Sequence, residues 1–134
     1  MRAVFDTNVL ISAFVFPGGP PEFAFRAALS GRIALITSPP LLAEFGRVLG
    51  EKFGWEDEMV EAAVGQVARI GAVVRPAARV SVINEDPADD RVLEAAQEGA
   101  VDVIVSGDRH LLRLGRWRDI RIVRVTELVA ELER

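Results

Sequence analysis

The N-terminal stretch MRAVFDTNVLISA (residues 1–13) decides the fold class, because an apolar run is interrupted by one carboxylate, Asp6, and then resumes. Residues 2–5 (RAVF) are typical of a short buried strand. Residues 9–14 (VLISAF) are typical of a helix that ends at the breaker cluster PGGPP. Asp6 therefore lies where a buried strand ends and a helix begins.

The rest of the chain continues this alternation of strands and helices. Further strands are predicted over residues 32–38, 72–76, 101–106 and 121–125. Further helices are predicted over 22–31, 39–54, 55–71, 86–100, 109–115 and 126–134, the last with Thr126 as its N-cap. This order favours a three-layer α/β/α sandwich with a central, mostly parallel sheet. No repeat or long linker divides the chain, so we expect a single domain over residues 1–134.

Composition limits the chemistry that the chain can perform. Half of its residues are hydrophobic and 27% are charged, as in a globular protein. Without cysteine and with His110 as the only histidine, it cannot build a thiolate zinc site, a disulfide or a multi-histidine metal site. Lys52 is the only lysine, so a P-loop lysine is excluded in practice. No membrane span or leader is recognisable, and a cytoplasmic location is expected.

A second carboxylate, Asp108, follows the strongest strand pattern of the chain, in VIVSGD. In doubly wound sheets, ligands gather beyond the carboxyl ends of the strands. Asp6 and Asp108 are therefore expected to meet at one edge of the sheet. The alternative interpretation is that each residue only caps the helix that follows it, with Gly107 forming the turn before Asp108.

The segment EDPADDRVLEAA (residues 85–96) concentrates acidic residues at the start of a helix. Asp86 followed by Pro87 is a good cap, and Asp89 three residues later resembles a capping box. Capping does not explain Asp90, which lies on the flank of the apolar stripe, whereas Asp89 faces nearer the apolar direction. The helical wheel leaves open which of Asp89 and Asp90 points over the sheet edge.

Glu44, in SPPLLAEFGRVL, is a fourth acidic candidate. It lies between the positions of an apolar helical stripe, so a solvated helix position is the simpler interpretation. Its interest depends on the other acids.

Together, VFDTNVLISA, the glutamate of SPPLLAEF, the helix start DDRVLEAA and VIVSGDRHLL resemble the PIN-domain family in order and spacing, most closely its toxin group. The resemblance covers residues 1 to about 126. It implies a metal-dependent endoribonuclease in which four acids bind Mg²⁺ or Mn²⁺. Carried over by position, these catalytic and metal-binding acids are Asp6, Glu44, Asp90 and Asp108, with Asn8 and Ser106 as supporting residues and Asp89 as the alternative to Asp90. Asp90 fits the family pattern better because an apolar pair follows it two and three residues later.

The residue chemistry agrees with this implication. Crowded carboxylates repel one another unless a cation neutralises them. Oxygen ligands suit Mg²⁺ or Mn²⁺, which could activate a water for attack on a phosphodiester without a protein nucleophile. His110 is expected to be a surface or supporting residue.

A basic segment, residues 109–124 (RHLLRLGRWRDIRIVR), is the predicted substrate-binding surface. Its arginines could grip phosphate, and Trp117 could stack on an unpaired base. The candidates are Arg109, Arg113, Arg116, Trp117 and Arg118. Alternatively, the arginines of this segment solvate an edge strand and pair with Glu127, Glu131 and Glu133.

The leading hypothesis is an Mg²⁺- or Mn²⁺-dependent ribonuclease that cleaves single-stranded RNA, in the role of the toxin of a toxin–antitoxin pair. The resemblance also implies an antitoxin partner and a homodimer, for which the apolar stretch at 14–25 (FVFPGGPPEFAF) is a candidate surface. The main rival is a PIN-like module that binds RNA or protein without cutting. A receiver or phosphatase domain is disfavoured, because DTN lacks a second acid and no lysine follows the later strands.

Overall fold

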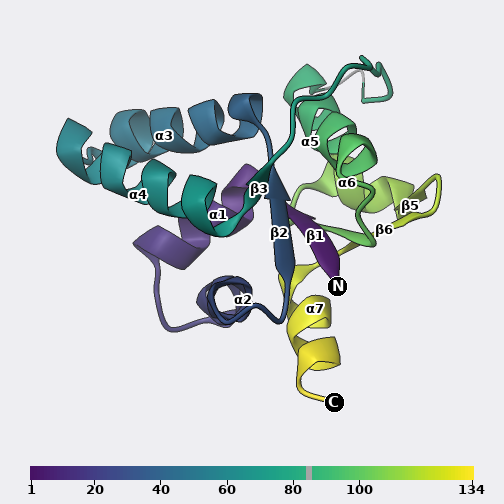
Figure 1. The fold of residues 1–134 in the computed structure, drawn as a ribbon, viewed down its shortest axis with the longest axis horizontal. Coiled ribbons are helices and arrows are strands. Elements are labelled where there is room, and N and C mark those ends of the chain that lie inside the picture. Colours follow the sequence, from purple (N-terminus) through teal and green to yellow (C-terminus); the bar gives the residue numbers. More distant parts are fainter. Residues whose placement is uncertain (84–85) are drawn as a thin grey trace.

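The computed structural model describes residues 1–83 and 86–134, and the strands of this part form one six-stranded sheet. They are β1 (Arg2–Phe5), β2 (Ala34–Thr37), β3 (Ala72–Val73), β4 (Val103–Val105), β5 (Arg116–Trp117) and β6 (Ile120–Val123). The spatial order is β3-β2-β1-β4-β6-β5, and all neighbours are parallel except β5 and β6. The N-terminal strand β1 is therefore an interior strand (Figure 1).

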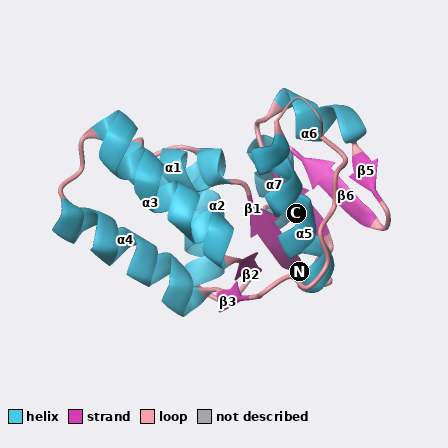
Figure 2. Cartoon of the chain, turned by 90° about the horizontal axis from the view of Figure 1, so that it is seen from above, coloured by secondary structure: helices cyan, strands magenta, loops and turns pink. Residues whose placement is uncertain are grey.

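Helices connect the strands. They are α1 (Thr7–Val15), α2 (Pro20–Leu29), α3 (Pro39–Phe53), α4 (Asp57–Ile70), α5 (Pro87–Glu98), α6 (Arg109–Leu114) and α7 (Val125–Leu132). Figure 2 shows α1 to α4 grouped to one side of the strands, with α3 and α4 side by side. The sheet thus lies between helical layers, as the predicted α/β/α sandwich requires.

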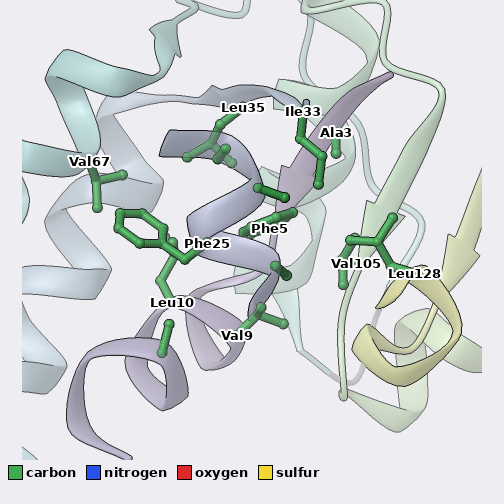
Figure 3. Close-up of a cluster of buried hydrophobic side chains, with 14 of the residues drawn as sticks. Ala3, Phe5, Val9, Leu10, Phe25, Ile33, Leu35, Val67, Val105 and Leu128 are labelled. Atoms are coloured by element: carbon green, nitrogen blue, oxygen red, sulfur yellow. The ribbon is translucent and has the colours of Figure 1, made fainter. Parts of the chain in front are cut away.

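Alternating side chains of the strands supply two separate cores, because successive residues of a strand point to opposite faces. Ala3 and Phe5 of β1 pack with α1, α2, α3 and α7 (Figure 3). Val4 points the other way and packs with Ile36, Ile104 and the apolar face of α5. Both faces of the sheet are covered, which explains why its strands are almost entirely apolar.

Two local predictions were wrong. Strand β5 was not expected. It forms a hairpin with β6 in which Trp117 pairs with Ile120, and the two-residue turn has Arg118 at a φ of 56° rather than a glycine that would signal it. Thr126 is not the N-cap of α7, because that helix begins at Val125, and the Glu127 carboxylate accepts the backbone N–H of Arg124 instead.

The described part of the chain contains no helix with the length and apolar character needed to cross a membrane.

Candidate metal centre

Five acidic side chains line one cavity at the carboxyl edge of the sheet. Asp6 follows β1 and Asp108 lies three residues beyond the end of β4; these neighbouring parallel strands pair Phe5 with Val105. The cavity has a volume of about 340 Å³. Its acidic members come from the ends of β1 and β4, from α3 and from the start of α5: Asp6, Glu44, Asp86, Asp89 and Asp108. The expected meeting of Asp6 and Asp108 at one edge is what the structure contains.

Three of these acids form a compact group. Asp86, Asp89 and Asp108 each offer a carboxylate oxygen, and these oxygens all lie within 4.8 Å of one another. Asp89 is buried, whereas Asp86 and Asp108 are half-buried. Carboxylate oxygens at such separations can be shared by a hard divalent cation.

Capping and site-building are not alternatives in this molecule, because the same carboxylates do both. One oxygen of Asp6 accepts the N–H of Thr7 at 2.7 Å, and one oxygen of Asp108 accepts the N–H of His110 at 2.8 Å. Asp86 likewise caps α5, accepting the N–H of Ala88 at 3.1 Å. Each cap uses one oxygen and thereby fixes the direction of the side chain.

Ser106 joins the two strand-end acids. It is fully buried; its hydroxyl donates to Asp6 Oδ2 at 2.7 Å, and its Oγ accepts the N–H of Asp108 at 2.9 Å. Because both of its hydrogen-bonding roles are taken, the hydroxyl orients the acids and is not available as a nucleophile. Asn8, the other expected supporting residue, lines the cavity from an exposed position on α1.

Asp90 does not join the other acids. It is buried at 3% exposure, but Oδ1 accepts the backbone N–H groups of Val82 and Ile83, at 3.0 and 2.9 Å. It therefore ties the segment after β3 to α5 and does not line the acidic cavity. Asp89, the residue nearer the apolar direction of the helix, takes the place that the family pattern gave to Asp90. The structure thus brings Asp89, and not Asp90, to the other acids, while the role of either residue as a metal ligand stays a prediction.

Burial and the repulsion between neighbouring carboxylates raise the pKa values of two of the acids. Burial raises the pKa of Asp6 from 3.8 to about 6, although its hydrogen bonds from Ser106 and Thr7 act in the opposite direction. Burial raises the pKa of Asp89 to about 8, and hydrogen bonding to Asp108 and the charges of Asp108, Asp6 and Asp86 add to the rise. A nearby cation would reverse these effects by favouring the ionised forms.

The donor set fits a hard divalent cation. Asp89 Oδ2 is a buried carboxylate oxygen without a hydrogen-bond partner among the described residues, and the same holds for Thr7 Oγ1 in the wall of the cavity. Buried polar atoms are normally satisfied, so such an atom marks a place where a cation or ordered water belongs. The cavity offers oxygen ligands and no imidazole or thiolate, as Mg²⁺ and Mn²⁺ prefer.

Comparison with known proteins assigns this architecture. Residues 2–110, including every acid of the cavity, match the family model described as PIN domain. The chain belongs to the PIN-domain family. That family is one of nucleases, and the acidic group of the cavity is a possible metal-binding site in this chain.

Individual relatives are more distant. The chain is 27% identical, over 119 residues, to the uncharacterized protein MJ1680 of Methanocaldococcus jannaschii, covering 85% of this chain and 75% of that one. Its fold is similar to PAE2754 from Pyrobaculum aerophilum, at 16% identity and a TM-score of 0.60, covering 100% and 91% of the two chains. It is also similar to VapBC-1 from nontypeable Haemophilus influenzae, at 17% identity and a TM-score of 0.62, covering 94% and 99%. At these identities the solved structures bear on the fold alone.

The cavity of this PIN domain has an apolar end as well as an acidic one. Phe16 and Phe53 meet edge to face with ring centroids 5.9 Å apart and are 61% and 38% exposed. They line the same cavity as the acids, together with Ile11, Val48 and Lys52. With a divalent cation in the acidic centre, the exposed aromatic rings beside it would suit a ligand that combines flat rings with negative charge.

The predicted arginine-rich surface is divided by the fold. Trp117 pairs with Ile120, the first residue of β6, so Arg116, Trp117 and Arg118 lie near the amino ends of the parallel strands, away from Asp108. Arg118 stacks over the Trp117 ring at 4.4 Å. Only Arg109, exposed at the start of α6, directly adjoins a cavity acid, and Arg113 lies exposed further along that helix.

Part of the alternative interpretation of this segment is correct, because Arg121 forms a bidentate ion pair with Glu131, at 2.7 and 3.0 Å. Sequence reasoning missed Asp86, because its role as a cap accounted for it fully. The signal was present in the pattern of three aspartates within five residues, since a cap occupies only one carboxylate oxygen.

Proposed function

We propose that the chain is an endoribonuclease that hydrolyses single-stranded RNA with Mg²⁺ or Mn²⁺ bound by Asp89, Asp108 and Asp86, with Asp6 and Glu44 completing the acidic end of the cavity. The observation that carries the proposal is the group of three carboxylates within 4.8 Å, one of which is buried without a partner for Oδ2. A module that only bound RNA would be weakened by acids in this position, since they repel phosphate.

The residues of the cavity have distinct tasks in this proposal. A divalent cation held there would lower the pKa of a bound water and neutralise charge on the phosphodiester. Ser106 holds Asp6 and the backbone of Asp108 at a constant separation. Asp89 Oδ2, which has no hydrogen-bond partner among the described residues, would be available to hold the cation. Phe16 and Phe53 offer a surface for a base next to the cleaved bond.

The direct test is cleavage of a labelled single-stranded RNA with Mg²⁺, with Mn²⁺ and with EDTA. Asp108→Asn should abolish cleavage, whereas Asp102→Asn should preserve it. Asp102 is a matched control because it precedes β4, is exposed, and its carboxylate accepts the N–H of Arg2, far from the cavity acids along the strand. Equal activity of the parent and Asp108→Asn, or metal-independent cleavage, would remove the nuclease proposal. RNA binding without any cleavage would favour the non-cutting module.

We further propose that the chain acts in the cytoplasm as the toxin of a toxin–antitoxin pair and forms a homodimer. The first point is supported by the similarity of the fold to VapBC-1 from nontypeable Haemophilus influenzae and by the resemblance of the motifs to toxin members of the family. The second rests on residues 14–25. In that segment Phe14 and Phe25 pack together in the core, but Phe16 and Phe23 remain exposed. Light scattering tests the dimer, and growth arrest on expression, relieved by a neighbouring gene, tests the toxin role.

A further inference from the structure

A second cavity, which we call the arginine pocket, lies at the carboxyl edge of β2 and β3. Its volume is about 200 Å³, and its lining comes from the start of α3, the segment after β3, and α5: Ser38, Pro39, Pro40, Arg75, Pro76, Arg79, Arg91 and Glu94. We propose that this pocket binds a backbone phosphate of the RNA, next to the phosphate that is cleaved. The inference rests on the proposed function.

The pocket is adjacent to the acidic cavity through the register of the sheet. Val4 of β1 pairs with Ile36 of β2, so continuing the register places Asp6 beside Ser38. Neighbouring strands are about 5 Å apart. The two cavities also share their helices, because α3 carries both Pro39 and Glu44, and α5 carries both Arg91 and Asp89. An extended chain crossing the acidic cavity toward β2 would therefore reach the arginine pocket.

The buried hydroxyl of Ser38 indicates that the pocket can bind a ligand. The residue is only 1% exposed, lines the pocket, and its Oγ has no hydrogen-bond partner among the described residues. It occupies the N-cap position of α3 but makes no side-chain capping bond. Because Pro39 and Pro40 have no backbone N–H, the first turn lacks two of its usual donors, and the Ser38 hydroxyl adds one. The helix dipole adds positive potential there.

The charges of the pocket suit an anion. Three arginines face one glutamate, which gives the pocket a net charge of two positive units in a chain whose net charge is −4. Arg75 and Arg79 are exposed, and neither forms an ion pair within the described part of the chain. An exposed guanidinium group can donate two parallel hydrogen bonds to two oxygens of one phosphate.

Glu94 positions the other residues of the pocket and does not neutralise its positive charge. Its carboxylate lies 2.8 Å from Arg91 Nε and also accepts the N–H of Val80 at 3.0 Å. It thereby holds the segment that carries Arg75 and Arg79 against α5. Arg91 Nη2 also donates to the Glu94 carboxylate, at 2.8 Å. Arg91 Nη1 makes no hydrogen bond with a described residue, so it remains available to a ligand.

The arrangement also answers how an acidic protein could hold RNA. The acidic cavity binds a phosphate only through a cation, whereas the arginine pocket needs none. RNA binding measured in EDTA should therefore depend on the arginine pocket.

The test is fluorescence anisotropy of a 5′-labelled single-stranded RNA in EDTA over a range of salt concentrations. For Arg75→Ala/Arg79→Ala we expect the Kd to rise about tenfold and the slope of log K against log salt to fall by about 0.7 to 1.4. Ser38→Ala should raise the Kd about threefold with little change in Tm, since its hydroxyl bonds nothing in the free protein. The matched control is Arg26→Ala/Arg69→Ala, which removes the same charge from exposed positions of α2 and α4 that line neither cavity.

Equal loss of binding in both double variants, or none in Arg75→Ala/Arg79→Ala, would overturn the assignment. Inorganic phosphate serves as the probe for a free-anion site. If phosphate raises the Tm of the parent and not of Arg75→Ala/Arg79→Ala, while RNA binding is the same in both, the pocket holds a small anion and the RNA assignment fails. Because these measurements exclude metal, they are independent of cleavage, so the nuclease proposal can fail in the Asp108→Asn experiment without affecting this one.

Discussion

Replacing Asp89 by asparagine should stabilise the metal-free protein at alkaline pH while abolishing its response to Mg²⁺. Asparagine keeps the shape of the side chain and removes the charge that its surroundings oppose. A group whose pKa is raised in the folded state contributes stability below its unfolded pKa and loses that contribution as the pH rises through the folded pKa. For Asp89 this interval runs from 3.8 to about 8.

The magnitude follows from the same interval. If the whole difference were confined to Asp89, it would correspond to about 6 kcal/mol. Burial and the neighbouring carboxylates both contribute to the raised pKa of Asp89, so we expect the substitution to recover only part of this free energy. We expect Asp89→Asn to be about 2 kcal/mol more stable than the parent at pH 8, equivalent to about 6–10 °C in Tm, and nearly equal to it at pH 4. Saturating Mg²⁺, at about 100 times its Kd, should stabilise only the parent, by about 2.7 kcal/mol.

Thermal unfolding at pH 4 and pH 8, with Mg²⁺ and with EDTA, measures both effects. The matched control is the neighbouring variant Asp90→Asn, which loses the charge that accepts the N–H groups of Val82 and Ile83. It should lose about 1–2 kcal/mol and keep the Mg²⁺ response. The reasoning is refuted if Asp89→Asn is destabilised at pH 8, or if Asp90→Asn is the variant that no longer responds to Mg²⁺.

Three further predictions concern single side chains. Ser106→Ala removes the hydroxyl that joins the two strand-end acids, so the Mg²⁺ concentration for half-maximal cleavage should rise about tenfold; an unchanged value would show that the acids hold their positions without it. Phe53→Ala should weaken binding of single-stranded RNA about tenfold, while Phe23→Ala, an exposed phenylalanine outside the cavity, should not, as anisotropy can show. Gly99→Ala would place a Cβ 2.5 Å from a core isoleucine and should cost about 1–3 kcal/mol in chemical denaturation. Gly50→Ala, in a helix with open space around it, should gain about 0.5 kcal/mol, and equal effects would contradict the packing argument.

The layers of the fold were predictable because the apolar patterns are strong. The strands over 2–5 and 101–106 and the helices after them follow from local composition, and their parallel pairing follows from the helices between them. The β5–β6 hairpin was not predictable, because β5 has two residues and its turn contains no glycine. It pairs with the edge of β6 that faces away from β4, and that edge is known only once the order of the strands is known.

The site was predictable to the level of the sheet edge and not to the level of the individual oxygen. Asp6 and Asp108 follow from the rule about strand ends. The choice between Asp89 and Asp90 required the position of the segment after β3, since two of its backbone N–H groups bind Asp90. Neighbouring residues on a helix differ by about 100° in direction. When Asp90 faces the segment after β3, Asp89 therefore faces the acidic cavity.

The interior position of β1 has a consequence for synthesis on the ribosome. On the ribosome, β1 is translated before both strands that it pairs with, residues 34–37 and residues 103–105, so its second neighbour does not exist until those last residues have been added. Asp108 and the carboxylates of α5 are also translated long after Asp6, which lines the same cavity. A nascent chain therefore cannot assemble the acidic centre, and with it the proposed nuclease site, before Asp108 has been translated.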